Sequence, residues 1–323
     1  MEKKLYIIKK FKIHVEQLDE INNFDFLNLV KDEDAAILFA QRLGLVRECI
    51  LCCSKEMTLR KNNGGKNNGY YFRCNVRGCR KEISIRKGTF FEGSHLSFSQ
   101  TLLFIYFFVN NETSFEQLKR KCRITSDATI VQWLTSCREV CSQYFIIHPT
   151  MLGGIGRVVE VDEMALVRRK YNRGRIVRTQ WVFGGYDVIG KIGFLVKVPD
   201  CTRETIFPII ARYIRPGSII HSDCARIYNA LCELGHEYYT VNHSRNFVDP
   251  HTRATTNHVE LLWQNVKSGN KKRYGTHRTT LDVHLGGFMW KQRFGNSLVT
   301  FLDHIKEQFE LNTLNVLCFP SLM

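Results

Sequence analysis

The sequence predicts an α/β protein in which a mixed-sheet core follows a small cysteine-rich domain and a helical region. Two observations carry this prediction. After residue 156, short β-branched apolar runs alternate with amphipathic helical patterns, and before residue 92 two close cysteine pairs bracket strand-like segments. A chain of 323 residues has room for more than one domain.

The first segment, residues 1–48, is expected to be helical. Its clearest signal is the stretch 32–43, which begins with three acidic residues, continues with apolar ones and is followed by Gly44 at a C-cap position. No secretory signal pattern opens the chain, so we expect its 12 cysteines to be reduced. Cysteines in a reducing compartment favour metal binding over disulfides.

Residues 49–92 are predicted to form a zinc ribbon. Two cysteine pairs are separated by the strand-like segments 58–61 and 70–73, and four thiolates close a tetrahedral structural site. The candidate zinc ligands are Cys49, Cys52, Cys74 and Cys79, and Cys53 is an alternative to Cys52.

The helical region, residues 93–147, contains a pattern similar to a helix-turn-helix. Segment 114–124, the turn 125–127 and segment 128–138 supply its parts, and Thr129, Gln132 and Arg138 would face DNA. Packing as a scaffold is the alternative for this pair of helices. The run 102–109 is too short to span a bilayer and predicts a buried helix. Residues 148–156 are rich in Pro and Gly and predict a linker.

Residues 157–311 predict the core domain, and 312–323 a C-terminal tail. Three strands come first, and helices and strands then alternate, which is the order of a ribonuclease-H-like fold. The expected strands are 157–163, 179–188, 192–198, 218–223 and 238–242, and the expected helices are 202–214, 227–234 and 257–267.

Three carboxylates in this domain predict a metal-dependent phosphodiester site. Asp162 and Asp223 end short apolar strands, and Glu260 lies on an amphipathic helix. In the predicted fold the two strands are neighbours, so the carboxylates can converge on two Mg²⁺ or Mn²⁺ ions, which prefer hard oxygen ligands. Such ions activate an attacking oxygen and stabilise a leaving one. Glu160 and Glu163 are alternatives on the first strand, where alternation puts Glu163 on the other face.

The helix that bears Glu260 carries two further candidate catalytic residues. Asn257 and Lys267 share its face, so an amide and an ammonium would lie beside the metals, and Lys267 would bind a phosphate. Trp263 falls near the same face, with core packing as its expected role.

Basic residues surround these elements. The chain has a formal net charge of +15 and an estimated pI near 9.3, which suits a polyanionic partner. The candidate DNA-binding residues lie in a predicted hairpin loop and after the Glu260 helix: Arg168, Arg169, Lys170, Arg173, Arg175, Arg178, Lys271, Lys272 and Arg273.

These motifs resemble the Merlin group of DDE transposases and their bacterial insertion-sequence relatives over roughly residues 30–305. The likeness rests on the cysteine pairs, on Gly88-Thr89-Phe90-Phe91, and on the segments 161–163, 221–223 and 256–267. It implies a zinc ribbon, a helix-turn-helix and a ribonuclease-H-like core, with Asp162, Asp223 and Glu260 as metal ligands. In the bacterial relatives an Asn takes the third position, and Asn257 is the matching residue here. The second cysteine pair is spaced more widely than in the family.

The resemblance implies a DNA transposase that cuts element ends by hydrolysis and joins the freed 3′-OH to target DNA. The expected partners are terminal inverted repeats, target DNA and further copies of the chain, with no membrane. A structural Zn²⁺ and two Mg²⁺ or Mn²⁺ ions are the expected cofactors. The nucleus is the expected location, or the cytoplasm and nucleoid in a prokaryote. The alternatives are a catalytically silent DNA-binding derivative and a metal-dependent nuclease without joining activity.

Overall fold

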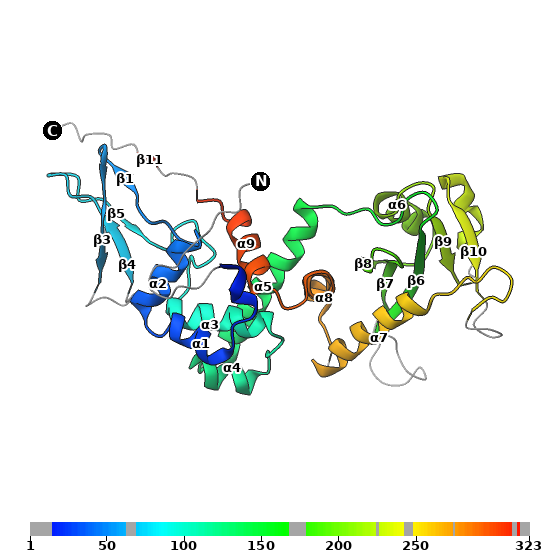
Figure 1. Cartoon of the computed structure of the whole chain (residues 1–323), viewed down its shortest axis with the longest axis horizontal. Helices are drawn as coiled ribbons and strands as arrows, with labels where there is room; N and C mark the ends of the chain where they lie inside the picture. The colour runs from blue at the N-terminus through cyan, green and yellow to red at the C-terminus, as the bar shows by residue number, and fades with distance from the viewer. Residues whose placement is uncertain are drawn as a thin grey trace. The chain divides into compact units, whose positions relative to one another are not determined.

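In the computed structural model, the described residues are 15–62, 69–167, 179–223, 226–241, 248–273, 275–311 and 315–316. They belong to two compact units (Figure 1). The first unit comprises Met1–Val140 with Asn296–Met323, and the second comprises Cys141–Gly295. The second unit therefore begins and ends earlier than the core domain predicted at 157–311. None of the described helices is both long and apolar enough to cross a lipid bilayer.

Helices make up much of the first unit. Their bounds are η1 Val15–Asp19, α1 Asn23–Leu29, α2 Glu33–Arg42, α3 Phe98–Val109, α4 Phe115–Cys122, α5 Asp127–Ile147, which continues into the second unit, and α9 Leu298–Gln308. The carboxylate of Asp32 accepts the Ala35 amide at 2.8 Å and begins α2, and Gly44 follows its end with φ of +71°. Ser97 and Gln100 form a capping box at the start of α3. The apolar run that ends α3 is buried, as predicted.

The pair α4 and α5 has the order predicted for the helix-turn-helix pattern. Helix α4 ends at Arg123, whose left-handed backbone turns the chain towards α5. Gln132 on α5 is exposed, whereas Thr129 and Arg138 are half-buried. The structure thus supplies the two helices, and DNA binding by them stays a prediction.

The cysteine-rich segment folds as short antiparallel strands. Strands β1 (Leu51–Cys52) and β2 (Lys55–Glu56) form a hairpin, and β11 (Asn315–Val316) pairs with β1. Strands β3 (Thr58–Lys61), β4 (Tyr70–Arg73) and β5 (Glu82–Ser84) form a three-stranded sheet. Phe72 and Ile85 are buried beneath this sheet, so one of its faces packs on the unit and the other meets solvent.

The second unit is built on a five-stranded mixed sheet with the order β10-β9-β6-β7-β8. Strands β6 (Val158–Val167), β7 (Gln180–Asp187) and β8 (Ile192–Val198) are antiparallel neighbours, whereas β9 (Ile219–Ser222) and β10 (Glu237–Thr240) run parallel to β6. The helical elements are α6 Arg203–Tyr213, η2 Arg226–Leu234, α7 Asn257–Lys272, η3 Arg278–Thr280 and α8 Leu281–Phe294. This strand order and these directions are those of the ribonuclease-H-like fold predicted from the sequence.

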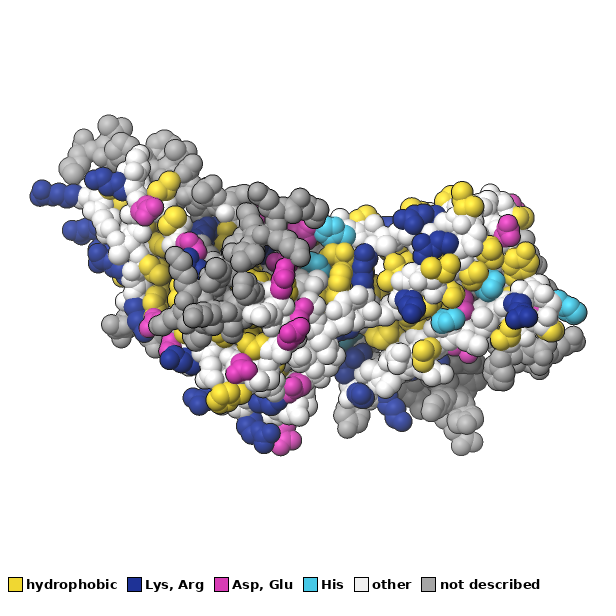
Figure 2. All heavy atoms as spheres, in the orientation of Figure 1, with side chains coloured by type: hydrophobic (Ala, Val, Ile, Leu, Met, Phe, Trp, Pro, Cys, Tyr) yellow, Lys and Arg dark blue, Asp and Glu magenta, His cyan; other side chains and the backbone are white. Residues whose placement is uncertain are grey.

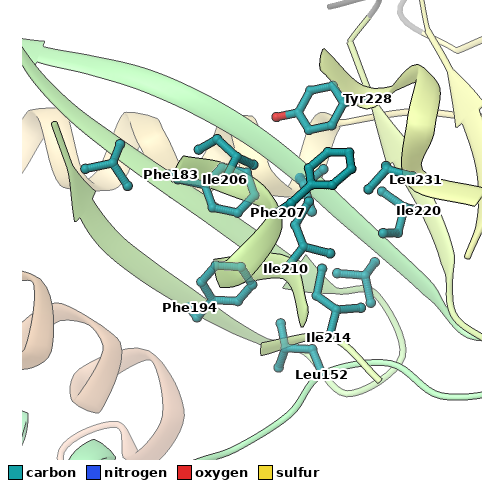
Figure 3. Close-up of a cluster of buried hydrophobic side chains, with 13 residues drawn as sticks. Leu152, Phe183, Phe194, Ile206, Phe207, Ile210, Ile214, Ile220, Tyr228 and Leu231 are labelled. Atoms are coloured by element: carbon teal, nitrogen blue, oxygen red, sulfur yellow. The ribbon is translucent and has the colours of Figure 1, made fainter. Parts of the chain in front are cut away.

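Helices cover both faces of this sheet (Figure 1). On one face, α6 and η2 pack on Val159, Val161 and Phe183, and Tyr228 joins this cluster (Figure 3). On the other face, α7 and α8 pack on Met164 and on strands β7 and β8. Since β6 is buried on both faces, its alternate residues enter different surroundings. The face of β6 on which an acidic residue lies therefore decides whether its side chain can reach the candidate site.

Candidate functional site

Strand pairing brings the two predicted aspartates together. Strands β6 and β9 are parallel, with Val158 opposite Ile219 and Glu160 opposite His221. Two residues further on, the same register places Asp162 beside Asp223, which directly follows the last residue of β9. Residues opposite each other on neighbouring strands point to the same face. The two carboxylates therefore share the face that α7 covers.

Helix α7 adds the third carboxylate. The indole Nε1 of Trp263 donates a hydrogen bond to Oδ2 of Asp162 at 2.8 Å. Glu260 precedes Trp263 by three residues, so both side chains lie on the face that meets the sheet. The hydroxyl of Thr256 donates to Oε1 of Glu260 at 3.4 Å. The hydrogen bond of Trp263 thus fixes the part of α7 that presents Glu260.

The pKa of Asp162 reports the proximity of the three groups. The pKa of this carboxyl is raised to about 6, chiefly by burial and also by the charges of Asp223 and Glu260. The hydrogen bond from Trp263 acts in the opposite direction. Among the described residues, those that act on Asp162 include two carboxylates and an indole, but no cation. The carboxylate oxygens of Asp162, Asp223 and Glu260 do not all lie within 4.8 Å of one another. A divalent metal ion, which prefers oxygen ligands, would offset the repulsion that raises the pKa of Asp162.

A glycine makes room for this arrangement. Gly184 on β7 lies opposite Asp162, and a Cβ placed there would come within 2.5 Å of Cη2 of Trp263. It would also lie 3.0 Å from the side chain of Leu195. Only a glycine allows the indole to lie flat on the sheet and reach Asp162.

Glu160, an alternative ligand in the sequence, has a different position. Its side chain is fully buried, and Oε2 accepts the backbone amides of His258 and Val259 at 2.7 and 3.0 Å. Oε1 lies 2.7 Å from Nδ1 of His258. Glu160 therefore binds the first turn of α7 and does not face the three clustered carboxylates. The neighbouring His221 accepts the Thr255 amide at 3.3 Å.

Glu163, the other alternative, lies on the opposite face of β6, as the alternation predicted. It accepts a hydrogen bond from the hydroxyl of Tyr228 at the border of the apolar cluster. Burial raises the pKa of Glu163 to about 7, and Asp162 and Asp223 add to this effect. Glu163 thus lies on the opposite face of the sheet from Asp162, near enough for the charges of Asp162 and Asp223 to affect its pKa.

The remaining predicted residues of α7 are on its surface. Asn257 is the first residue of the helix and is exposed, and Lys267 is exposed two turns after Glu260. Lys271 and Lys272 are exposed at its end. Arg273 is also exposed, desolvation lowers the pKa of its guanidinium, and it donates to Oγ1 of Thr276 at 3.2 Å.

The predicted basic hairpin lies outside the described residues. Its members are Arg168, Arg169, Lys170, Arg173, Arg175 and Arg178. Their contact with DNA stays a prediction.

A second cluster, in the first unit, consists of Cys52, Cys53, Cys74 and Cys79, whose sulfur atoms all lie within 4.8 Å of one another. The Sγ atom of Cys52 is 3.6 Å from that of Cys79 and 3.9 Å from that of Cys53. Tetrahedral Zn–S bonds of about 2.3 Å require sulfur atoms about 3.8 Å apart. The four thiols therefore fit a structural zinc ion.

This cluster differs from the predicted ligand set at one position. Cys49 is exposed and lies outside the cluster. Cys53 supplies the fourth sulfur atom, in addition to that of Cys52. Cys53 and Ser54 have φ of 51° and 60°. Two successive residues in the left-handed region turn the chain sharply, so adjacent cysteines can face one centre. The spacing of the cysteines alone does not reveal this turn, although it allows Cys53 as a zinc ligand in place of Cys52.

The hydrogen bond from Trp263 to Asp162 is the contact that the sequence analysis missed. Trp263 was expected to pack in the core, and it does so. Its spacing of three residues from Glu260 was the signal that it also faces the carboxylates.

Comparisons with known proteins agree with this geometry. Residues 152–292 match the family model described as the ISXO2-like transposase domain. A protein of Haemophilus influenzae described as an uncharacterized transposase-like protein is 29% identical over 121 residues, which cover 38% of this chain and 95% of that protein. The second unit thus carries a DDE transposase domain of this type.

Two solved structures also match, each at 15% identity and a TM-score of 0.28. One is the catalytic core domain of BIV integrase, with 40% of this chain and 80% of that chain covered. The other is a simian T-cell lymphotropic virus intasome in complex with PP2A regulatory subunit B56 gamma, with 58% and 67% covered. At these scores the fold assignment rests on the strand order of the sheet and not on these likenesses.

Proposed function

We propose that this protein is a DNA transposase that cuts DNA at the ends of a mobile element and joins those ends to target DNA. One observation carries the proposal: Asp162, Asp223 and Glu260 converge from two parallel strands and a helix. The match of residues 152–292 to a transposase domain supports it. The matched relative is bacterial, which favours action on DNA in a cell without a nucleus.

The three carboxylates would hold two Mg²⁺ or Mn²⁺ ions. When bound, such ions supply Lewis-acid activation of the attacking oxygen and stabilise the leaving oxygen. Asp162, Asp223 and Glu260 would supply the carboxylate oxygens that hold them. Asn257 is the alternative to Glu260 as the third residue. The indole of Trp263 keeps the Asp162 carboxylate oriented and ionised, because it donates to Oδ2.

Two phosphodiester reactions would follow at this site. Water attacks a phosphorus atom at the element end, the bond to the 3′ oxygen breaks, and that oxygen leaves as a 3′-OH. The 3′-OH then attacks a phosphorus atom of target DNA, the bond from that phosphorus to the target's own 3′ oxygen breaks, and that oxygen leaves as a 3′-OH, without a covalent bond to the protein. Lys267 would bind a phosphate as a point charge. Two DNA ends must meet, so we propose a dimer or higher multimer on DNA.

DNA contacts beyond the site would come from several parts of the chain. The basic hairpin of residues 168–178 and the end of α7, with Lys271, Lys272 and Arg273, would bind phosphates near the site. The zinc ribbon and the helices α4 and α5 would recognise the terminal inverted repeats. Zn²⁺ would be held by the cysteine cluster.

The test is metal-dependent nicking and joining of supercoiled plasmid. We expect activity with Mn²⁺ in the native chain and a loss of at least about a hundredfold in Asp223→Asn, because one metal ligand is removed. Asp282→Asn is the matched control, since Asp282 is an exposed carboxylate on α8 that pairs with Lys197.

The products separate the alternatives. Joined products indicate a transposase, and nicked products alone indicate a metal-dependent nuclease. Equal activity in the native chain and Asp223→Asn, with DNA binding retained in both, contradicts the enzyme and leaves a silent DNA-binding derivative.

A further inference from the structure

The first turn of α7 is held by a buried carboxylate of the sheet. Glu160 accepts two backbone amides of this turn and contacts Nδ1 of His258. The ring of His258 stacks on Tyr186, which is the cross-strand partner of Glu160, with ring centres 5.5 Å apart and planes 3° apart. Two residues beyond Glu160 on β6 is Asp162, and two residues beyond His258 on α7 is Glu260.

We propose that Glu160 is a positioning residue for the metal site, which sets the distance between Glu260 on α7 and Asp162 on β6. The amides at a helix start have no partner within the helix and favour a negative charge. A buried carboxylate bonded to two of them joins helix and strand at one point. The hydrogen bond from Trp263 to Asp162 is a second contact between helix and strand, one turn beyond Glu260. Glu260 lies between these two contacts along α7, so its position depends on both.

This inference rests on the proposed function, because it assigns Glu160 a role in holding the metals. The test measures Mn²⁺ binding by the electron paramagnetic resonance of free Mn²⁺, without DNA or turnover. Site-specific binding is the difference between the native chain and Asp223→Asn. We expect Glu160→Gln to weaken this binding by about ten- to a hundredfold, the usual effect of residues that orient metal ligands.

Two further variants make the test independent of folding. His258→Ala leaves Glu160 in place and removes one of its three contacts, and we expect a smaller loss of about two- to fivefold by the same reasoning. Asp187→Asn is the matched control: Asp187 is a buried carboxylate of the same sheet, and it accepts the amides of Gly153 and Gly190 at 2.9 and 2.7 Å. The substitution Asp187→Asn should lower the melting temperature and leave the affinity for Mn²⁺ unchanged.

The outcomes separate this inference from the proposed function. If the native chain and Asp223→Asn bind Mn²⁺ equally, the metal site itself is contradicted. If Asp223→Asn loses binding but His258→Ala and folded Glu160→Gln bind like the native chain, the positioning role is contradicted. If Glu160→Gln does not fold, unchanged affinity in His258→Ala alone overturns it.

A separate observation concerns the zinc ribbon. Residues 49–92 contain ten Lys and Arg against three Asp and Glu, so this short segment carries +7 of the net charge of +15. Lys and Arg side chains lie along the part of the surface that covers strands β3, β4 and β5 (Figure 2). Basic charge is therefore concentrated on one small domain.

The three-stranded sheet presents one accessible face. Alternation and register place six side chains on it, and none of the six is buried: Thr58, Arg60, Tyr71, Arg73, Glu82 and Ser84. Arg60 lies opposite Tyr71, and Arg73 follows Tyr71 on the same face. Arg73 is 3.4 Å from Glu82. Two guanidinium groups thus flank one half-buried aromatic ring.

We infer that this face of the ribbon binds the sugar–phosphate backbone of DNA through Arg60 and Arg73, with Tyr71 packing against the DNA between them. The inference rests on the proposed function, in which DNA is the partner. Guanidinium groups bind phosphate oxygens by paired hydrogen bonds, and a partly exposed aromatic ring beside them adds contact area. The charge of the segment is complementary to a polyanion.

Fluorescence anisotropy with a labelled duplex tests this face. The zinc-loaded full chain would be used in the Asp223→Asn background without divalent metal, so cleavage plays no part. We expect Arg60→Ala and Arg73→Ala each to weaken binding and to reduce the salt slope by about one. Lys31→Ala, which removes an exposed cation elsewhere in the first unit, should change affinity less than about twofold.

Two results are decisive here. If the native chain binds the duplex and both arginine variants bind with the same affinity and salt slope, the ribbon face is not a DNA contact. If no form of the chain binds DNA, the proposed function fails first.

Discussion

At the scale of single residues, Asp162 is the centre of the site, because Trp263 and Glu260 act on it from α7 and Asp223 acts on it from the end of β9. Its carboxyl group has an ordinary pKa of 3.8 and a pKa of about 6 in the folded chain. Between these values the native state keeps a proton that the unfolded state has released. The free energy of unfolding contributed by Asp162 is therefore highest below about pH 4 and falls as the pH rises towards 6 and above.

The direction of this pKa shift predicts how the stability of the metal-free chain depends on pH. The free energy of unfolding of the native chain, relative to Asp162→Asn, should decrease from about pH 4 to about pH 7, and Mn²⁺ should reverse the decrease. Urea unfolding at several pH values measures it. A difference that rises with pH would mean that Asp162 is paired with a cation in the folded chain.

Gly184 provides a second prediction at this scale. Gly184→Ala places a methyl group against Trp263, and overpacking of this kind costs about 1–3 kcal/mol. Gly269→Ala is the control on α7, where a Cβ meets only the flexible side chain of Arg273 and alanine gains up to about 1 kcal/mol in helix propensity. Denaturant unfolding compares the two. If Gly184→Ala is as stable as the native chain, the indole of Trp263 does not need the space that Gly184 leaves.

At the scale of elements, the cysteine cluster depends on a turn at Cys53 and Ser54 that cysteine spacing did not reveal. The structure places Cys53 at the metal cluster and Cys49 outside it. We predict that Cys53→Ser loses the bound zinc, whereas Cys49→Ser keeps one equivalent, because only the first substitution removes a thiolate from the tetrahedron.

Zinc released by acid and measured with a chromogenic chelator tests this prediction. The two variants change the same residue type within five positions and serve as controls for each other. Loss of zinc in Cys49→Ser with retention in Cys53→Ser would restore the ligand set predicted from spacing.

The regular elements were largely predictable from the sequence, and the contacts between them were not. Strand β8 begins and ends where the apolar alternation placed it, and α2 begins after its acidic cap. Helix α7 extends to Lys272, beyond the predicted end at 267, although Ser268, Gly269 and Asn270 are poor helix formers. Lys271 and Lys272 in its last turn favour this end of the helix because their charges complement the helix dipole. The neighbouring positions of Asp162 and Asp223 were predictable from the order of the strands, although β6 continues to Val167 and Asp162 lies within it and not at its end. The binding of Glu160 to α7 was not predictable, since it joins residues that are far apart in the sequence.

At the scale of the whole molecule, the chain combines a catalytic unit with a basic, cysteine-rich unit. The second unit supplies the three carboxylates, and the first supplies the ribbon with its excess of positive charge. The chain leaves the first unit within α5 and returns to it at residue 296, so both ends of the catalytic unit are tied to the same partner unit. The candidate metal-binding carboxylates and the cysteine-rich segment with its excess of positive charge thus belong to different parts of one chain.

The central claim is that Asp162, Asp223 and Glu260 converge on a divalent cation. Fe²⁺ bound at such a site, with ascorbate and peroxide, generates hydroxyl radicals that cleave the nearby backbone. We predict cuts near all three residues, although they are far apart in the sequence, with suppression by excess Mg²⁺ and loss in Asp223→Asn. Cleavage near only one of them, or cleavage unaffected by Mg²⁺ and by the substitution, would contradict the account.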